Sequence, residues 1–206
     1  MVKSTKNTQL RRSPGRPREF DMEAALDGAL LVFREHGYHG ASLGELGSAM
    51  GLTAGSIYKA FNDKRTLFLA AFDHYTHRRH AELGKLLDAE KTGFDKVRAM
   101  LRFYAEVSHD LEGRRGCLVV GSLTHLTTFD AKTSARVTTA LRRLETLLRD
   151  LIRLGVSDGS IPPGINADAL ARTLLCLLQG FRVVGKAGRT RTEMLAAVDQ
   201  ALRLLA

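Results

Sequence analysis

The 206-residue chain contains only two cysteines, Cys117 and Cys176, which excludes a disulfide framework but leaves open a single bridge or a reactive thiol. No stretch approaches the roughly 18 consecutive apolar residues of a membrane-spanning helix, and the N-terminus lacks the apolar segment of a secretion signal. Sustained alternation of apolar and polar residues, which would indicate strands, is also missing. We therefore expect a soluble, cytoplasmic protein with no membrane partner.

Motifs for catalysis and for metal binding are missing as well. The sequence has no nucleophile elbow and no zinc-protease motif, so we predict no enzyme and no cofactor. His74, His77 and His80 follow one another at intervals of three, but a straight helix cannot point all three the same way. The segment GFRVVGKA, residues 180–187, nearly matches a phosphate-binding loop, yet Ala187 replaces the residue that should hold magnesium.

The charge of the chain is positive but unevenly distributed. A net charge of +9 and a pI near 9.9 favour an anionic partner, with nucleic acid as the first candidate. Residues 1–20 hold six Lys or Arg against one Glu, which predicts a basic flexible arm. Residues 21–64 hold only three basic residues against six acidic ones, so bulk charge does not mark them as a DNA-binding segment.

Apolar residues recur at helical spacing along almost the whole chain, which predicts an all-α fold. Four helices are expected near the N-terminus, and Gly37 and Gly51 should end the first two. Only Gly51 and Leu52 separate the second helix from the third, which is the helix-turn-helix layout. The residues expected to cap the four helices are Asp21, Ser42, Thr53 and Asp63.

Longer helices follow, and they suggest a second domain. The predicted ranges are 94–110, 116–127, 130–155, 166–186 and 190–205. The chain is therefore divided into the basic arm 1–20, an N-terminal three-helix helix-turn-helix domain 21–66, and a larger helical domain 67–206.

The third predicted helix lies in LTAGSIYKAFNDK, residues 52–64, and it carries small residues where a core helix would carry leucines. Ala54, Gly55 and Ser56 would let its backbone approach the base edges and phosphates of a DNA major groove. The residues expected to anchor it to the first two helices are Ile57, Ala60 and Phe61. This composition is typical of a helix that faces outward toward DNA.

The stretch GASLGELGSAMGLTAGSIYKAFNDKRTLF, after ALLVFREHGY, resembles the DNA-binding domain of the TetR (tetracycline repressor) family of bacterial transcriptional regulators. The resemblance covers residues 21 to about 75. The sequence departs from the family pattern at Gly44 and Gly47, and each interior glycine costs about 0.5–1 kcal/mol of helix stability relative to alanine. The matching residues are Phe33, Gly37, Ser42, Leu46, Gly51, Gly55, Ser56, Tyr58, Phe61, Lys64 and Leu67.

The resemblance implies a repressor of the bacterial cytoplasm and nucleoid that binds a palindromic double-stranded DNA operator as a homodimer. A small-molecule effector would release it. Ser42, Tyr58 and Lys64 are implied to contact phosphates. The residues implied to face base edges or the adjacent backbone are Thr53, Ala54, Gly55, Ser56 and Lys59.

The basic arm contains Gly15-Arg16-Pro17-Arg18, which is similar to the core of an AT-hook. In such a motif the two arginines, here Arg16 and Arg18, enter a narrow A·T minor groove. The alternative is a solvated basic tail with no defined contact.

The resemblance also implies an effector cavity and a dimer interface in the larger domain. The candidate cavity residues combine apolar bulk with polar groups: Phe103, Tyr104, Val107, Cys117, Leu118, His125, Phe129 and Gln179. Apolar stripes on the last two helices are expected to form the dimer interface, with packing inside one chain as the alternative. The stripe residues are Leu170, Leu174, Leu177, Leu178, Phe181, Val184, Leu195, Val198, Leu202 and Leu205.

Two alternative functions are left open. Cys117 follows Arg114 and Arg115, whose charge could lower the pKa of its thiol and make it a sensor of electrophiles. The acidic balance of residues 21–64 instead favours a helical module that binds small molecules or proteins without contacting DNA.

Overall fold

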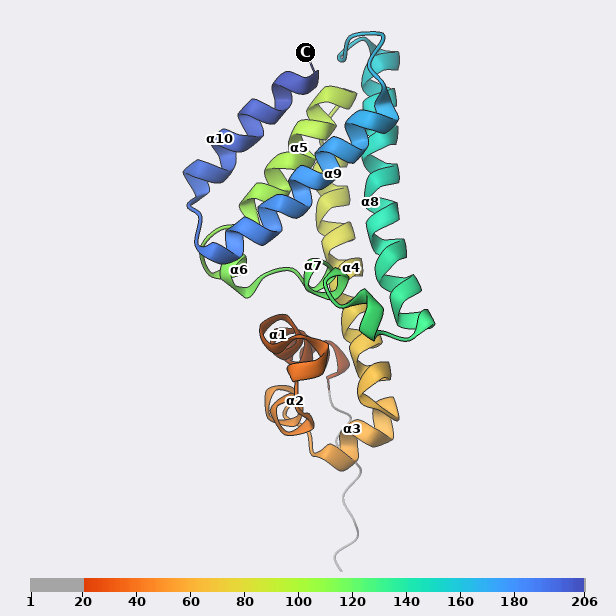
Figure 1. Cartoon of the computed structure of the whole chain (residues 1–206), viewed down its shortest axis with the longest axis vertical. Coiled ribbons are helices and arrows are strands. Elements are labelled where there is room, and N and C mark those ends of the chain that lie inside the picture. Colours follow the sequence, from red (N-terminus) through yellow and green to blue (C-terminus); the bar gives the residue numbers. More distant parts are fainter. Residues whose placement is uncertain (1–20, 206) are drawn as a thin grey trace, which may run out of the picture.

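The computed structural model describes residues 21–205, which form ten α-helices and three short 3-10 helices with no strand in that range. Figure 1 shows two regions: α1, α2 and α3 lie together at one end, and α5, α8, α9 and α10 form a larger bundle at the other. The long helix α4 runs between the regions, while α6 and α7 lie where they meet. The predicted all-α fold of two regions is confirmed.

The first three helices are α1 (Met22–Gly40), α2 (Leu43–Met50) and α3 (Ala54–Phe61). Asp21, Ser42 and Thr53 cap them as predicted, because each side chain accepts hydrogen bonds from backbone N–H groups of the first turn. Gly37 has a positive φ of 70° and interrupts helical geometry, but one more turn continues to Gly40. Gly51 ends α2 in the left-handed conformation, as expected.

Two glycines allow α2 to lie very close to its neighbours. A Cβ at Gly28 of α1 would collide with the backbone carbonyl of Ala49, and a Cβ at Gly47 would lie 2.8 Å from the carbonyl oxygen of Leu52. A Cβ at Gly44, in contrast, would lie 3.9 Å from the Ser42 hydroxyl oxygen, which is an ordinary contact distance. The glycine at 47 therefore has a packing reason that its low helix propensity concealed, whereas the glycine at 44 has none.

The fourth helix, α4 (Lys64–Asp88), belongs to both regions. Its first half packs into a core with α1, α2 and α3 through Phe68, Phe72 and Tyr75, which are 1–3% exposed. Its second half packs through Leu83 and Leu87 into the core of the larger bundle. The domain boundary expected after residue 66 thus falls inside a continuous helix, with no break in the chain there.

The larger bundle contains α5 (Gly93–Glu106), α8 (Ala131–Asp158), α9 (Ala167–Val184) and α10 (Arg191–Leu202). The predicted ranges for these helices are correct to within a few residues. Two short helices, α6 (Asp110–Arg115) and α7 (Leu118–Leu123), replace the predicted helix 116–127. The sequence reading missed α6 and overextended α7, because both are single turns or little more in a connecting segment.

The apolar stripes of α9 and α10 serve mainly the core of the single chain. Five stripe residues are only 0–3% exposed and belong to the core of the larger bundle, so they cannot form a dimer surface: Leu174, Leu178, Phe181, Val198 and Leu205. The prediction was wrong for these five, because periodicity cannot distinguish packing inside one chain from packing between two. The stripe residues that keep some exposure are Leu170, Leu177, Val184, Leu195 and Leu202.

None of the helices between residues 21 and 205 combines the length and apolar character that crossing a membrane would require.

Candidate nucleic-acid interface and cavity

The helix α3 is anchored on one side and exposed on the other. Ile57 and Phe61 are 1% and 5% exposed and bury its inner side in the core with α1, α2 and α4. Ala60, expected on the same side, is exposed instead. The residues of its N-terminus and outer face that are predicted to contact DNA are exposed or partly exposed: Thr53, Ala54, Gly55, Ser56, Tyr58 and Lys59.

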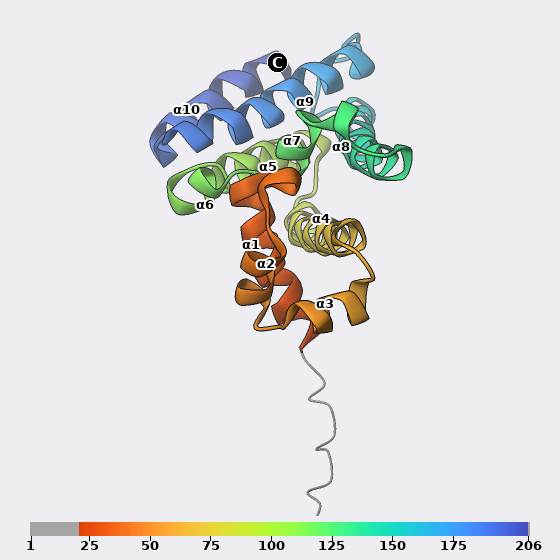
Figure 2. The ribbon, with the colours of Figure 1, turned by 60° about the horizontal axis from the view of Figure 1, so that its bottom comes forward.

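This outer face is small and lies at one end of the molecule. Figure 2 shows α3 with α1 and α2 at the end away from α8, α9 and α10. A Cβ at Gly55 would meet nothing within 4 Å, so the backbone of α3 is bare at this point. At its start, the Thr53 hydroxyl accepts from the backbone N–H of Ser56 at 3.2 Å. Another molecule could therefore approach the N-terminus of α3 closely.

Ser42 and Lys64, which are also predicted to contact phosphates, already have hydrogen-bond partners within the chain. Ser42 donates from its hydroxyl to the Glu45 carboxylate at 2.6 Å, and the two residues form a capping box at the start of α2. The Lys64 ammonium donates to the carbonyl of His39 at 3.3 Å and lies 5.0 Å from the centre of the Tyr38 ring. An ammonium has three donors, so Lys64 retains capacity for a phosphate. Burial lowers its pKa.

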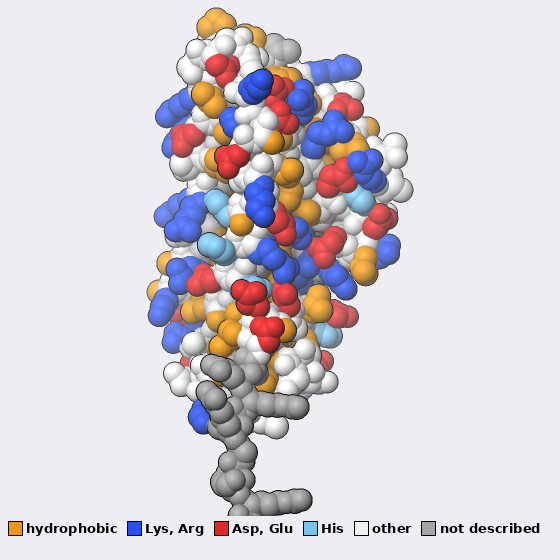
Figure 3. Space-filling view, turned by 180° about the vertical axis from the view of Figure 1, so that it is seen from behind, with side chains coloured by type: hydrophobic (Ala, Val, Ile, Leu, Met, Phe, Trp, Pro, Cys, Tyr) orange, Lys and Arg blue, Asp and Glu red, His pale blue; other side chains and the backbone are white. Residues whose placement is uncertain are grey.

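The predicted arm contacts, Arg16 and Arg18, lie outside the described residues. On the face shown in Figure 3, basic and acidic side chains are interspersed along the height of the molecule. Bulk charge on that face therefore does not identify a DNA-binding surface, in agreement with the charge count of residues 21–64.

A cavity of about 850 Å³ lies between α4, α5, α8 and α9. Five predicted cavity residues line it: Phe103, Tyr104, Val107, Cys117 and Gln179. The other three, Leu118, His125 and Phe129, line a separate pocket of about 350 Å³ next to α1, which Cys117 also borders. They were misplaced because α7 and the turn after it pack on the N-terminal core, where Phe129 lies 5.4 Å from Tyr38, centre to centre.

The charged groups that line the large cavity are mostly cationic. Four arginines line it and only one acidic residue, Asp73, does so. Asp73 is paired with Arg136 at 3.0 Å. Arg182 is 3% exposed, and its guanidinium donates to the Ser108 hydroxyl at 3.2 Å, to the Gly116 carbonyl at 3.1 Å and to the Val107 carbonyl.

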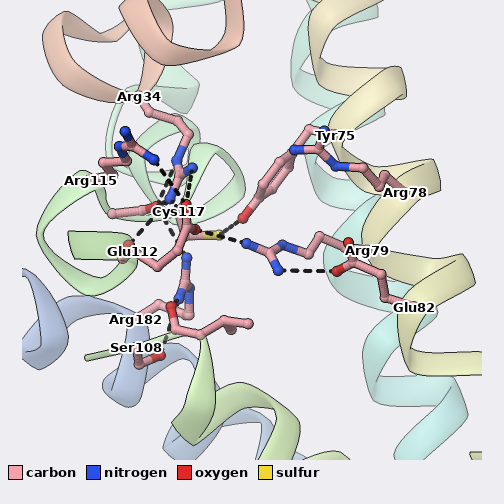
Figure 4. A network of polar contacts seen from close by, with 12 residues as sticks. Arg34, Tyr75, Arg78, Arg79, Glu82, Ser108, Glu112, Arg115, Cys117 and Arg182 are labelled. Carbon is pink, nitrogen blue, oxygen red and sulfur yellow. Dashed lines mark hydrogen bonds and ion pairs between the residues drawn. The ribbon is translucent and has the colours of Figure 1, made fainter. Parts of the chain in front are cut away.

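A network of charged groups joins this cavity to the first helix (Figure 4). Arg34 of α1 is 7% exposed and donates to the Glu112 carboxylate at 3.0 Å and to the Gly116 carbonyl at 2.6 Å. Arg79 of α4 donates to the same carboxylate at 2.9 Å, and Arg182 to the same carbonyl. The arginines hold the pKa of Glu112 at about 2, although burial alone would raise it.

Cys117 lies at the centre of this network, as Figure 4 shows. The Tyr75 hydroxyl donates to its Sγ at 3.5 Å. Burial would raise the pKa of the thiol, but the charge of Arg182 and the hydrogen bond from Tyr75 lower it overall. The sequence had suggested Arg114 and Arg115 for this role, whereas the relevant arginine comes from α9.

Sequence reasoning missed Arg34, Arg79, Glu112 and Arg182. One signal was present: Arg182 interrupts the apolar stripe of α9 between Phe181 and Val183. A charge inside such a stripe is buried only with partners. No comparable local pattern marks Arg34, Arg79 or Glu112, because their partners lie far away in the chain.

Comparison with known proteins agrees with this architecture. Residues 25–71 match the family model described as bacterial regulatory proteins, tetR family. Residues 93–201 match the model described as tetracyclin repressor-like, C-terminal domain. The chain is 28% identical over 205 residues to the HTH-type transcriptional repressor ComR of Escherichia coli (strain K12), covering 98% of this chain and 97% of that protein.

Solved structures show the same fold bound to DNA. Two structures of cysteine mutants of the TetR family transcriptional regulator CifR, complexed with 26-bp double-strand operator DNA, are 33% identical to this chain. Their TM-scores are 0.81 and 0.82. The matches cover 91% and 93% of this chain and 98% and 100% of theirs.

Proposed function

Because the chain belongs to the TetR family of bacterial transcriptional regulators, we propose that it represses transcription by binding a palindromic operator as a homodimer. A small molecule entering the cavity releases it. The observation that carries the proposal is the exposed, small-residue outer face of α3, held in place by Ile57 and Phe61. We also infer that the protein has no catalytic activity and that it acts at the nucleoid in the cytoplasm.

In this proposal α3 enters the major groove of one half-site. Thr53, Ala54, Gly55, Ser56 and Lys59 face base edges or the adjacent backbone. The phosphate contacts come from Ser42, Tyr58 and Lys64, and the arm contributes Arg16 and Arg18 in the minor groove.

The homodimer places two copies of α3 about one helical turn of DNA apart. The residues proposed for its interface are the partly exposed members of the α9 and α10 stripes: Leu170, Leu177, Val184, Leu195 and Leu202.

The charged network supplies a route from the cavity to the DNA-binding region. Arg79 and Arg182 line the cavity, and each shares an acceptor with Arg34 of α1. A ligand that attracts Arg79 or Arg182 therefore changes the hydrogen bonds that Arg34 makes to the Glu112 carboxylate or the Gly116 carbonyl. Since α1 packs on both α2 and α4, such a change alters the position of α3. The effector then acts through its different affinity for the two arrangements.

The test is operator binding measured by fluorescence anisotropy on DNA from upstream of the chain's own gene. Affinity should fall steeply between about 50 and 200 mM salt, because each phosphate contact releases counterions from the DNA. Tyr58→Phe and Lys59→Ala should each weaken binding roughly fivefold. Lys85→Ala, a matched loss of charge at the far end of α4, should change nothing. Equal binding by all variants would refute the assignment.

A thiol sensor is the second candidate function, and the lowered pKa of Cys117 together with its hydrogen bond from Tyr75 favours it. In the test, iodoacetamide alkylates the thiolate: an S–C bond forms, the C–I bond breaks and iodide leaves. Alkylation should release the operator from the natural chain and from Cys176→Ser but not from Cys117→Ser. Cys176 is the exposed cysteine, so it controls for nonspecific modification. Release from Cys117→Ser as well would exclude this candidate.

A further inference from the structure

The large cavity holds more positive than negative charge, and this excess bears on the effector that the proposed function requires. Four arginines line it: Arg79, Arg136, Arg143 and Arg182. The one acidic residue in the lining, Asp73, already pairs with Arg136. Three histidines of α4 also line the cavity: His74, His77 and His80.

Arg182 is a buried cation that pairs with no carboxylate among residues 21–205; the acidic group beside it is the Cys117 thiol, whose pKa it lowers. The hydrogen-bond acceptors of Arg182 are two backbone carbonyls, of Val107 and Gly116, and the Ser108 hydroxyl. A buried charge is costly unless an opposite charge compensates it. Arg182 therefore favours a negative group in its vicinity.

Arg79 has one donor with no acceptor. Its terminal nitrogens bind Glu82 at 3.1 Å and Glu112 at 2.9 Å, but its Nε atom is buried and has no hydrogen-bond partner among the described residues. A buried donor without a partner loses its hydration without compensation. Because Arg79 lines the cavity, an acceptor on a bound ligand could satisfy this group.

Two phenols, Tyr75 and Tyr104, add neutral polar groups to the same cavity. Tyr75 is 3% exposed, and burial raises its pKa to about 12, with the nearby Cys117 as a further cause. Burial likewise raises the pKa of Tyr104. Both hydroxyls thus remain protonated at neutral pH. The O–H of Tyr75 is already donated to Cys117 Sγ, so we expect Tyr104 to be the phenol that donates to a ligand.

The remaining wall is apolar and suits a hydrocarbon or aromatic body. Its residues include Leu83 of α4, Phe103 of α5, Val107 at the end of α5 and Leu144 of α8. A volume of about 850 Å³ lies within the usual range for ligand pockets. The cavity therefore combines a cationic end with an apolar remainder.

We propose that the effector is an organic anion, a carboxylate attached to an apolar body, whose negative charge lies against Arg79 and Arg182. This proposal rests on the ligand-responsive function above. A neutral ligand would leave Arg182 uncompensated, and a cationic one would be repelled by it. Carboxylates are the natural partners of arginine because two oxygens match the guanidinium donors.

The test uses three probes of the same shape: 4-phenylbutyrate, 4-phenylbutan-1-ol and 4-phenylbutylammonium. Their binding to the DNA-free full chain is measured by isothermal titration calorimetry. The carboxylate should bind at least tenfold more tightly than the alcohol, and the ammonium should not bind measurably. Equal affinities, tighter binding of the alcohol or ammonium, or no binding of any probe at low millimolar concentration would overturn the proposal.

Variants locate the charge contact. Arg79→Gln should weaken 4-phenylbutyrate binding at least tenfold and leave alcohol binding unchanged, while Arg79→Lys, which keeps the charge and guards against misfolding, should lose less. Arg98→Gln removes an arginine outside the cavity, paired with Asp95, and should have no effect. Unchanged carboxylate affinity in Arg79→Gln would contradict the assignment. Since no DNA is present, failure here leaves operator binding to be judged by its own assay.

Discussion

The two regions of the molecule bury their apolar residues in different ways. The core around α1, α2 and α3 contains a cluster of aromatic rings in mutual contact: Phe68 lies 5.1 Å from both Phe33 and Tyr38, centre to centre. The core of the larger bundle is mostly aliphatic and lies beside a cavity of about 850 Å³ lined by arginines. The first region is built to hold α3 in one position, whereas the second has space that a ligand can fill.

The sharpest way to break this contrast is to remove one aromatic ring from each region. Phe68→Ala should cost about 3–5 kcal/mol of unfolding free energy, because Phe68 is 1% exposed and the packed rings cannot close the gap. Phe103→Ala should cost less than about 2 kcal/mol, since Phe103 is only partly buried and already borders empty space. Urea denaturation followed by circular dichroism measures both. Equal losses would mean that the cavity wall is as tightly packed as the N-terminal core.

A second prediction concerns the junction between the regions, where arginines depress the pKa of Glu112 to about 2. A depressed carboxyl pKa contributes stability above the unfolded value of about 4.3, and this stability is lost as pH falls from there toward 2. We expect about 1 kcal/mol, because 39% of the Glu112 side chain is exposed and solvent screens its ion pairs.

The measurement is unfolding free energy against pH for the natural chain and Glu112→Gln. The difference between the two should be largest near pH 6 and shrink below pH 4. Glu90 is partly exposed and forms no ion pair among the described residues, so Glu90→Gln serves as the control. A difference that does not change with pH would show that the carboxylate charge at 112 contributes nothing.

The sequence predicts contacts between residues that are close along the chain better than contacts between distant ones. Caps such as Ser42 and Thr53 depend on residues three positions away, and the structure confirms them. The ion pair of Arg34 with Glu112 joins residues 78 positions apart, so no local pattern announces it. The α9 stripe was recognised, but whether Leu174 and Leu178 face their own chain or a partner depends on where α5 and α8 lie.

The smallest expected effect separates two glycines that the sequence treats alike. Gly44→Ala should stabilise the chain by about 0.5–1 kcal/mol, because alanine favours the helix and its Cβ would make only an ordinary contact, 3.9 Å from the Ser42 hydroxyl oxygen. Gly47→Ala should instead destabilise it, since the new Cβ would lie 2.8 Å from the Leu52 carbonyl oxygen in the turn before α3. Thermal unfolding of the two variants should therefore shift in opposite directions. Because the turn at Leu52 positions α3, Gly47→Ala should also weaken operator binding, while Gly44→Ala should not. If the unfolding temperatures of both variants shift in the same direction, the turn yields to the added methyl group.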